Sequence, residues 1–471
     1  MAALAVALIA VAGFAAALWR ARILSVVGGM AGEVTGGIGA MFDKSLDDDA
    51  KERAVQQAGL ALIKRGWAII WRFGLALLAA AIPIYAASLA GYVPTEASMG
   101  VMLRLDFIAI VSVAACGAAW AFGRGTATDT SQGDQTLHAL AFSSPAVQRA
   151  LGRLDSRLFA RRIAPTDMGA PIFVTSLARG GTTAVLNALA SLPGTATHRY
   201  RDMPFLTAPL LWDRLSGKRQ VTRAERAHGD GMEIDLDSAE AFDEVHWMLQ
   251  WPEKYDKGTI PLWGADDARA DAGDALQAEF RKIAALRAPG GSNTRYLSKN
   301  NANIARLAIL PEMFPGAQII VPLRGPAAHA ASLMRQHMNF LERHQKDDHG
   351  RRYMADIGHF EFGALHKRLG FEGDFDGLSP DMPDYWLTYW IAAFEHVEQH
   401  GSHAIFVDQD KLRADPEGTM VRLTSLLELE PSSDFASFFR TTPDPQPRDQ
   451  FSPDLMAKAD ALYARLAKRS I

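Results

Sequence analysis

The chain of 471 residues carries a formal net charge of −4 and is 48% hydrophobic. Two or three domains are expected at this length, and the slightly acidic balance argues against binding nucleic acid through bulk charge. The single cysteine, Cys116, excludes an intrachain disulfide and fits a reducing compartment.

The first 125 residues hold three apolar stretches, at residues 2–19, 67–92 and 101–122, each about long enough to cross a bilayer. A buried bundle of soluble helices is the alternative, which runs of this length and Ala/Leu content disfavour. The connection after the first stretch is basic, whereas residues 93–100 carry no lysine or arginine. Because positive loops stay in the cytoplasm, we expect a multi-pass protein of the inner or plasma membrane, with the bilayer as a partner and everything after Arg124 cytoplasmic.

Residues 126–169 are expected to be a polar linker followed by a juxtamembrane helix. Ser144 and Pro145 are typical of a helix start, and the helix would extend to residue 162. One of its faces is basic, with Arg149, Arg153, Arg157, Arg161 and Arg162. This face either is simply solvated or lies against anionic lipid headgroups.

From residue 170 onward, strands alternate with helices. Buried strands are predicted at residues 171–174, 296–298, 317–323 and 403–407, and helices at 238–249, 271–287, 302–313 and 324–339. This alternation predicts an α/β domain over residues 170–440, with a parallel sheet and helices on both faces. A C-terminal linker and helix would occupy residues 441–471.

Residues 171–183, PIFVTSLARGGTT, predict an anion site made of a strand, a glycine-bearing loop and a helix start. Arg179, Lys299 and Arg324 each follow a predicted strand, and ligands of parallel sheets bind beyond the carboxyl ends of the strands. We therefore expect these three cations to converge on one crevice. The loop lacks the GxxxxGK[ST] pattern, which disfavours a kinase or GTPase.

Three segments together resemble the sulfotransferase family. SLARGGTT is similar to the family's 5′-phosphosulfate loop, FPGAQIIVPLRGPAAHAASL to its 3′-phosphate segment, and FVDQDKL with ADPE to a segment near the end of its fold. The resemblance covers about residues 170–427 and implies a P-loop NTPase-like fold. Ala178, Gly180 and Gly325 depart from the residues usual in the family.

The resemblance implies 3′-phosphoadenosine 5′-phosphosulfate as co-substrate, with no metal. Residues that would hold its 5′-phosphosulfate are Arg179, Gly180, Gly181, Thr182 and Thr183, and those that would hold its 3′-phosphate are Arg324 and Ser332. Arg179 would stabilise charge on the leaving group, and Lys299 would bridge donor and acceptor or be an ordinary strand-end lysine. The catalytic base would be Asp202 or His198, unless Asp202 only pairs with a neighbouring arginine.

These observations predict transfer of a sulfuryl group to a hydroxyl or amine of a lipid, a glycan or another acceptor. The membrane anchor favours a lipid or lipid-linked glycan. Residues 341–362, which are rich in histidine without metal-ligand spacing, are expected to form a loop over the acceptor site. The alternatives are another nucleotide-dependent transferase, such as a kinase, and a non-catalytic membrane protein with a degenerate nucleotide-binding fold.

Overall fold

The structure is a computed structural model that describes residues 2–20, 48–104, 106–107, 111, 132–216, 224–225, 233–234, 237–240, 242–289, 293–431, 434–440, 442 and 444–471. The chain divides into two compact units, Met1–Thr128 and Asp129–Ile471. Most of the predicted linker, and residues 112–122 of the third predicted membrane span, lie outside the described residues.

The first unit contains the helices α1 (Ala2–Arg20), α3 (Asp48–Leu89) and α4 (Thr95–Met102). Helix α1 packs against α3, where the ring of Phe14 meets the edge of Phe73 with centroids 5.6 Å apart. Among the described residues, one helix segment, Ile70–Leu89, is long and apolar enough to cross a membrane, and Ala2–Ala17 is a shorter apolar segment. Within the described residues, which leave out most of the third predicted span, length and composition therefore support one candidate span.

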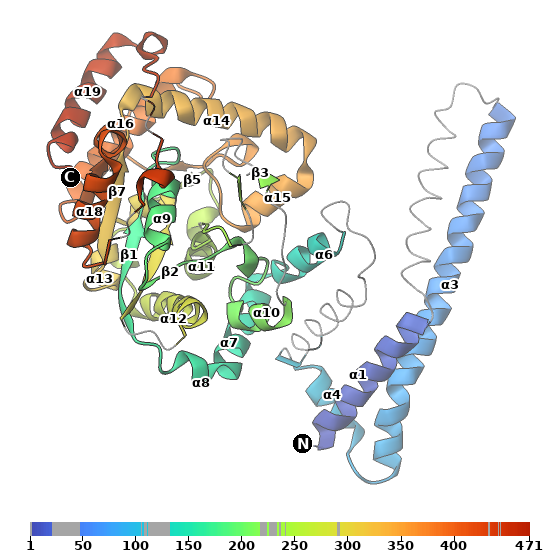
Figure 1. The fold of residues 1–471 in the computed structure, drawn as a ribbon. Coiled ribbons are helices and arrows are strands. Elements are labelled where there is room, and N and C mark those ends of the chain that lie inside the picture. Colours follow the sequence, from blue (N-terminus) through green and yellow to red (C-terminus); the bar gives the residue numbers. More distant parts are fainter. Residues whose placement is uncertain are drawn as a thin grey trace. The chain divides into compact units, whose positions relative to one another are not determined.

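A five-stranded sheet organises the second unit (Figure 1). Its strand order is β2 (Thr195–Ala196), β6 (Thr294–Lys299), β1 (Met168–Val174), β7 (Gln318–Leu323) and β9 (Ile405–Asp408). All neighbouring strands are parallel. Val174 lies opposite both Lys299 and Ile320, so the strands end at a common edge.

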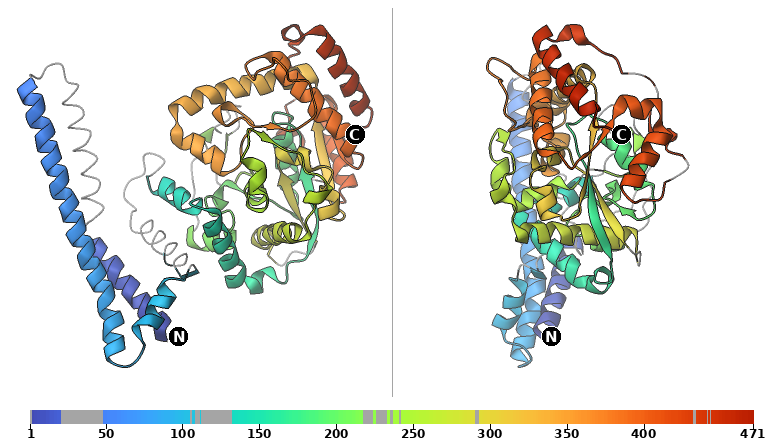
Figure 2. Two further views of the ribbon diagram at one scale, coloured as in Figure 1. Left: turned by 180° about the vertical axis from the view of Figure 1, so that it is seen from behind. Right: turned by 90° about the vertical axis from the view of Figure 1, so that its left-hand side faces the viewer.

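Both faces of the sheet are covered by helices, as Figures 1 and 2 show. On one face, Ile172 and Val174 belong to a core shared with α9 (Thr182–Ala190), α17 (Gln409–Ala414) and α18 (Pro416–Leu426). On the other face, Phe173 belongs to a core shared with α12 (Ala270–Arg287), α14 (Pro326–Lys346), α16 (Pro383–His400) and α19 (Pro453–Ala467). Successive β1 side chains point to opposite faces, and both faces are apolar because both are buried. The predicted α/β fold with a parallel sheet is confirmed.

Shorter elements complete the unit. The remaining helices are α6 (Gln132–Ala141), α7 (Pro145–Leu158), α8 (Ala160–Ile163), α10 (Pro209–Ser216), α11 (Glu244–Gln250), α13 (Leu310–Met313) and α15 (Asp348–Asp356). The 3₁₀ turns are η1 (Tyr200–Asp202), η2 (Pro252–Tyr255), η3 (Ala265–Asp267), η4 (Asn301–Arg306), η5 (Gly363–Leu365), η6 (Ala436–Phe438) and η7 (Arg448–Gln450). Strands β3 (Ala224–Glu225) and β4 (Glu233–Ile234) pair antiparallel, and β5 (Thr259–Ile260) and β8 (Arg368–Leu369) pair parallel.

Several predicted boundaries were wrong for local reasons. The helix expected from residue 238 begins at Glu244, because Ala239 forms a bridge with Arg199 instead. The helix expected over residues 302–313 is the 3₁₀ turn η4 followed by α13, which starts with Pro311 in its first turn. The loop expected over residues 341–362 is largely helical: α14 and α15 are separated by Asp347, and residues 357–362 run irregularly.

Candidate functional site

The loop between β1 and α9 is held by hydrogen bonds to the end of β7 and to the residue that follows it. The Ser176 hydroxyl donates to the carbonyl of Pro322 over 2.9 Å, and the Arg324 guanidinium donates to the carbonyl of Arg179 over 2.8 Å. Arg179 and Gly181 both adopt left-handed backbone, with φ of 67° and 93°. Gly181 precedes α9 without a side-chain cap. Since the first N–H groups of a helix have no intrahelical partner, this helix start can bind an anion.

One cavity of about 280 Å³ lies at the carboxyl ends of the strands. Arg179, Lys299 and Arg324 all line it, so the structure brings the three predicted cations together. Gly181, Thr182 and Thr183 line it as well. Gly180 and Ser332, also predicted to hold the co-substrate, are not among the residues that line this cavity. Gly180 is packed over Ser176, where an added Cβ would approach the hydroxyl to 2.7 Å, and the Ser332 hydroxyl accepts a hydrogen bond from Arg179 Nε over 3.4 Å.

Arg324 is engaged by a carboxylate that sequence reasoning missed. Its Nε donates to Asp444 over 2.7 Å, and Arg413 donates to the same carboxylate oxygen over 2.8 Å. Burial would raise the pKa of Asp444, but the hydrogen bond and charge of Arg324, with those of Arg413, lower it. Asp444 is thus an anion where the resemblance implies the 3′-phosphate, and a phosphate would have to replace it.

The walls of the cavity fit a phosphorylated ligand. The buried Nε2 of Gln409 lines the cavity and has no hydrogen-bond partner among the described residues. A Cβ at Gly181 would come within 2.5 Å of that atom, so the glycine keeps the backbone close to it. Arg413 and Arg440 add further cations to the lining. The unpaired Nε2 of Gln409, the start of α9 and the clustered cations all favour a ligand that carries several negative charges.

Lys299 is almost fully buried, and its Nζ lies 3.6 Å from Glu240 Oε1. Glu240 also accepts a hydrogen bond from the Tyr200 hydroxyl. The lysine therefore has one side toward the cavity and one toward a buried carboxylate, which holds the ammonium at the end of β6.

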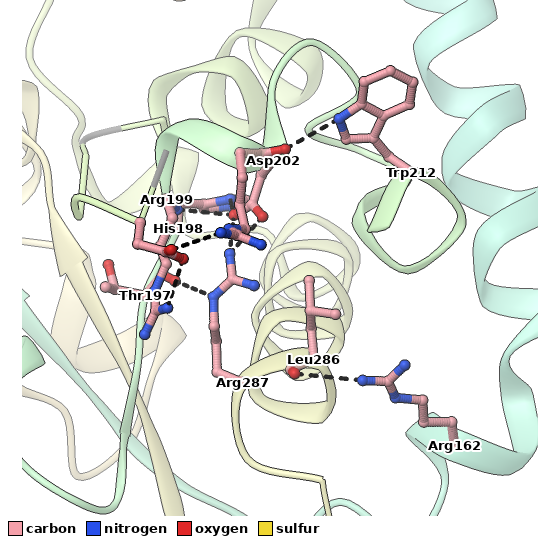
Figure 3. A network of polar contacts seen from close by, with 10 residues as sticks. Arg162, Thr197, His198, Arg199, Asp202, Trp212, Leu286 and Arg287 are labelled. Atoms are coloured by element: carbon pink, nitrogen blue, oxygen red, sulfur yellow. Dashed lines mark hydrogen bonds and ion pairs between the residues drawn. The ribbon is translucent and has the colours of Figure 1, made fainter. Parts of the chain in front are cut away.

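Asp202 and His198 are brought together, but not into the cavity lining. Asp202 is 2% exposed, and Arg287 donates to both of its carboxylate oxygens at 2.5 and 2.6 Å (Figure 3). The backbone N–H of Arg199 and His198 Nδ1 also contact Asp202, at 2.9 and 3.2 Å. Burial would raise the pKa of Asp202, but the charge of Arg287 and the His198 contact lower it.

This geometry argues against Asp202 as the catalytic base. Each oxygen is occupied by a strong donor, and the carboxylate ties the chain after β2 to the end of α12. The expected pairing with a neighbouring arginine is replaced by pairing with Arg287, because Arg199 and Arg201 both reach Asp237. His198 is 1% exposed and stacks on His246, with ring centroids 5.7 Å apart.

Two residues that sequence reasoning did not single out, His359 and Glu361, also line the cavity. They belong to residues 357–362, within the stretch expected to cover the acceptor site. No strand end or motif marks them, so the only signal in the sequence is their position in that histidine-rich stretch.

The chain belongs to the sulfotransferase family, because the family model described as "Sulfotransferase family" matches residues 171–434. It is accordingly a transferase. Similar solved structures include a sulfotransferase from Mycobacterium tuberculosis, with 13% identity, a TM-score of 0.40, and coverage of 75% of this chain and 98% of that chain. A sulfotransferase from Mycobacterium avium has 14% identity, a TM-score of 0.39, and coverage of 70% and 83%. One from Alicyclobacillus acidocaldarius has 12% identity, a TM-score of 0.31, and coverage of 64% and 97%. No curated protein matches the chain.

Proposed function

We propose that this sulfotransferase takes its sulfuryl group from 3′-phosphoadenosine 5′-phosphosulfate. The observation that carries the proposal is a single cavity with two anion-binding regions. One is the start of α9 with Arg179, and the other is Arg324, which now pairs with Asp444. A nucleotide with phosphate groups at both its 3′ and 5′ positions matches two such regions better than a single triphosphate chain does.

In this proposal, Arg179, Gly180, Gly181, Thr182 and Thr183 form the loop that holds the 5′-phosphosulfate. Negative charge grows on the departing 5′-phosphate as the sulfur–oxygen bond breaks, and preorganised N–H groups with a fixed cation stabilise it. Arg179 supplies that cation and keeps its proton. Lys299, which lines the same cavity, would neutralise the sulfuryl oxygens between donor and acceptor.

Arg324 would bind the 3′-phosphate after exchanging Asp444 for it. Ser332 supports this arrangement through the guanidinium of Arg179, to which it is hydrogen-bonded. Charge-assisted contacts to phosphate are among the stronger hydrogen bonds in proteins. In this proposal, Arg324 has an anionic partner both before and after the phosphate binds.

We further propose a membrane-anchored enzyme with a cytoplasmic catalytic unit and a lipid or lipid-linked glycan as acceptor. The apolar segment Ile70–Leu89 and the basic residues preceding it support the anchor. Deleting residues 1–125 should then reduce turnover of a membrane-embedded acceptor far more than turnover of a soluble one. Equal turnover of both acceptors by the truncated chain would contradict this part of the proposal.

Binding of adenosine 3′,5′-bisphosphate to the purified full-length chain tests the donor. Arg324→Ala should weaken this binding by about 10- to 100-fold, because a hydrogen bond to a charged group contributes about 1.5–3 kcal/mol. The matched control is Arg335→Ala, an exposed arginine on helix α14, which follows Arg324 in the chain; this variant should leave the affinity unchanged. Tight binding of ATP without binding of the bisphosphate would refute the proposal in favour of a kinase-like enzyme.

A further inference from the structure

A second cavity adjoins the anion cavity. Four residues line both: Ala178, Asn301, His359 and Glu361. The lining of the second cavity is mainly apolar and aromatic, and includes Ile260, Leu333, Phe360, Leu369, Trp386 and Tyr389. These residues come from β5, α14, residues 357–362, β8 and α16. A reacting group placed at the shared wall would therefore have an anion on one side and a hydrocarbon environment on the other.

Glu361 is oriented at this shared wall by a chain of hydrogen bonds. Asn301 Nδ2 donates to Glu361 Oε1 over 3.0 Å, and Asn301 Oδ1 accepts from the Thr182 hydroxyl over 3.3 Å. Because Thr182 is the first residue of α9, Asn301 links the Glu361 carboxylate to the start of the helix that follows the anion-binding loop.

The backbone around Glu361 is also constrained. His359 N–H donates to the carbonyl of Met354 over 2.9 Å, and Lys367 N–H donates to the carbonyl of Phe360 over 2.8 Å. Gly358, directly before His359, adopts left-handed backbone with φ of 78°. A Cβ at this position would come within 2.5 Å of Glu244. This segment therefore presents Glu361 from a fixed position.

The other carboxylates at the two cavities are already engaged. Glu244 lines the apolar cavity, but Arg306 donates to both of its oxygens at 2.7 and 2.8 Å. Burial would raise the pKa of Glu244, but the charge and hydrogen bonds of Arg306 lower it. On the far side of the anion cavity, Asp444 is held by two arginines. Among the described residues, Glu361 is the carboxylate at the wall that both cavities share.

We propose that Glu361 is the general base of sulfuryl transfer, and that the apolar cavity holds the hydrocarbon part of an acceptor alcohol or phenol. This inference rests on the proposed donor. The acceptor oxygen forms a bond to sulfur while the bond from sulfur to the 5′-phosphate oxygen breaks. The electron pair of that bond leaves with the phosphate, and the acceptor proton moves to Glu361.

Of the two acceptors proposed above, the lining favours a lipid over a lipid-linked glycan. Several hydroxyls of a sugar would face leucine, isoleucine and aromatic side chains, which is costly. Polar groups of the lining such as Asn300 and Lys367 already donate to Glu244 and to the carbonyl of Tyr255. An alkyl chain or an aromatic ring would gain from the same surfaces. Its hydroxyl would meet Glu361 at the shared wall, next to the anion-binding loop.

The test uses the full-length chain in detergent, labelled 3′-phosphoadenosine 5′-phosphosulfate, and three acceptor probes: 1-octanol, 4-nitrophenol and glucose. Wild-type protein should sulfate the first two in preference to glucose. Glu361→Gln should lower turnover by about 100-fold or more, the usual contribution of general-base catalysis. It should not weaken adenosine 3′,5′-bisphosphate binding, because it removes a negative charge from the lining of the anion cavity. The exposed Glu372→Gln is the matched control and should keep wild-type turnover.

The outcomes separate this inference from the proposed donor. Wild-type turnover by Glu361→Gln, or a loss confined to His359→Gln, would overturn the assignment of the base. Preference for glucose, or no transfer to either apolar probe, would overturn the acceptor class. Failure of the wild-type chain to bind the bisphosphate would instead overturn the donor. Retained bisphosphate binding by the glutamine variant shows that its fold is intact.

Discussion

His329 is expected to make the stability of the fold depend on pH. This side chain of α14 is fully buried. Its Nε2 contacts the carbonyl of Ala178 in the anion-binding loop at 2.8 Å, and its Nδ1 accepts from Trp390 Nε1–H over 3.2 Å. Nε2 must therefore carry the proton, and Nδ1 has no room for a second one. Burial, followed by the nearby charge of Arg324, lowers the pKa of His329 from 6.5 to about 3.

The sign follows from proton counting. Between pH 3 and 6.5 the unfolded chain binds a proton that folded His329 does not, so its contribution to stability is complete above 6.5 and is lost as the pH falls. One pKa unit corresponds to about 1.4 kcal/mol, so a pH of about 5 should remove about 2 kcal/mol of unfolding free energy through this residue. Because His329 bonds to the carbonyl of Ala178, protonation of this ring should also disturb the anion-binding loop.

The assay compares His329→Gln with the wild-type chain by urea unfolding at about pH 7.5 and about pH 5. The variant should be less stable at the higher pH, because it lacks the fitted contacts of the ring. Its deficit should shrink by about 2 kcal/mol at the lower pH, because it cannot take up the proton that destabilises the wild type. A deficit that stays constant or grows on acidification would refute the reasoning.

Three further predictions concern the site and its supports. Asp444→Asn should tighten adenosine 3′,5′-bisphosphate binding by about tenfold, because the phosphate no longer displaces a carboxylate from Arg324; weaker binding in a titration would show that Asp444 positions the arginine instead. Gly181→Ala should abolish detectable bisphosphate binding while the circular dichroism spectrum persists, because its left-handed backbone and crowded Cβ position disfavour a side chain; wild-type affinity would show that the loop tolerates a side chain there. Arg306→Met should lower the free energy of unfolding by about 3–5 kcal/mol, since it leaves the Glu244 carboxylate buried and unpaired; a denaturant midpoint equal to wild type would contradict this.

Local sequence patterns determined the fold class, the anion-binding loop and the cations that surround it. Strands at residues 171–174 and 317–323 were predictable because a strand buried on both faces needs an uninterrupted apolar run. The loop from Arg179 to Thr183 was predictable because its turn, its helix start and its charge lie within a few consecutive residues. Convergence of Arg179, Lys299 and Arg324 followed from the rule that parallel strands end at one edge.

Helix boundaries were less predictable where backbone hydrogen bonds to distant segments compete with helix formation. The bridge between Ala239 and Arg199 delays α11 until Glu244, and nothing near residue 239 in the sequence reveals its partner. Composition likewise marks an apolar stretch at residues 67–92 without setting where its helix begins, and α3 starts at Asp48.

Only the tertiary structure decided which side chains are occupied and which can react. Asp202 had the composition and position of a base, but Arg287, 85 residues later, binds both of its oxygens. Asp444 reaches Arg324 across 120 residues and fills the region where a phosphate was expected. Glu361 carries no motif, and Asn301 links its carboxylate to Thr182 at the end of the anion-binding loop. Strand and loop propensities act over a few residues, whereas the availability of a carboxylate depends on neighbours that only the folded chain brings within hydrogen-bonding distance.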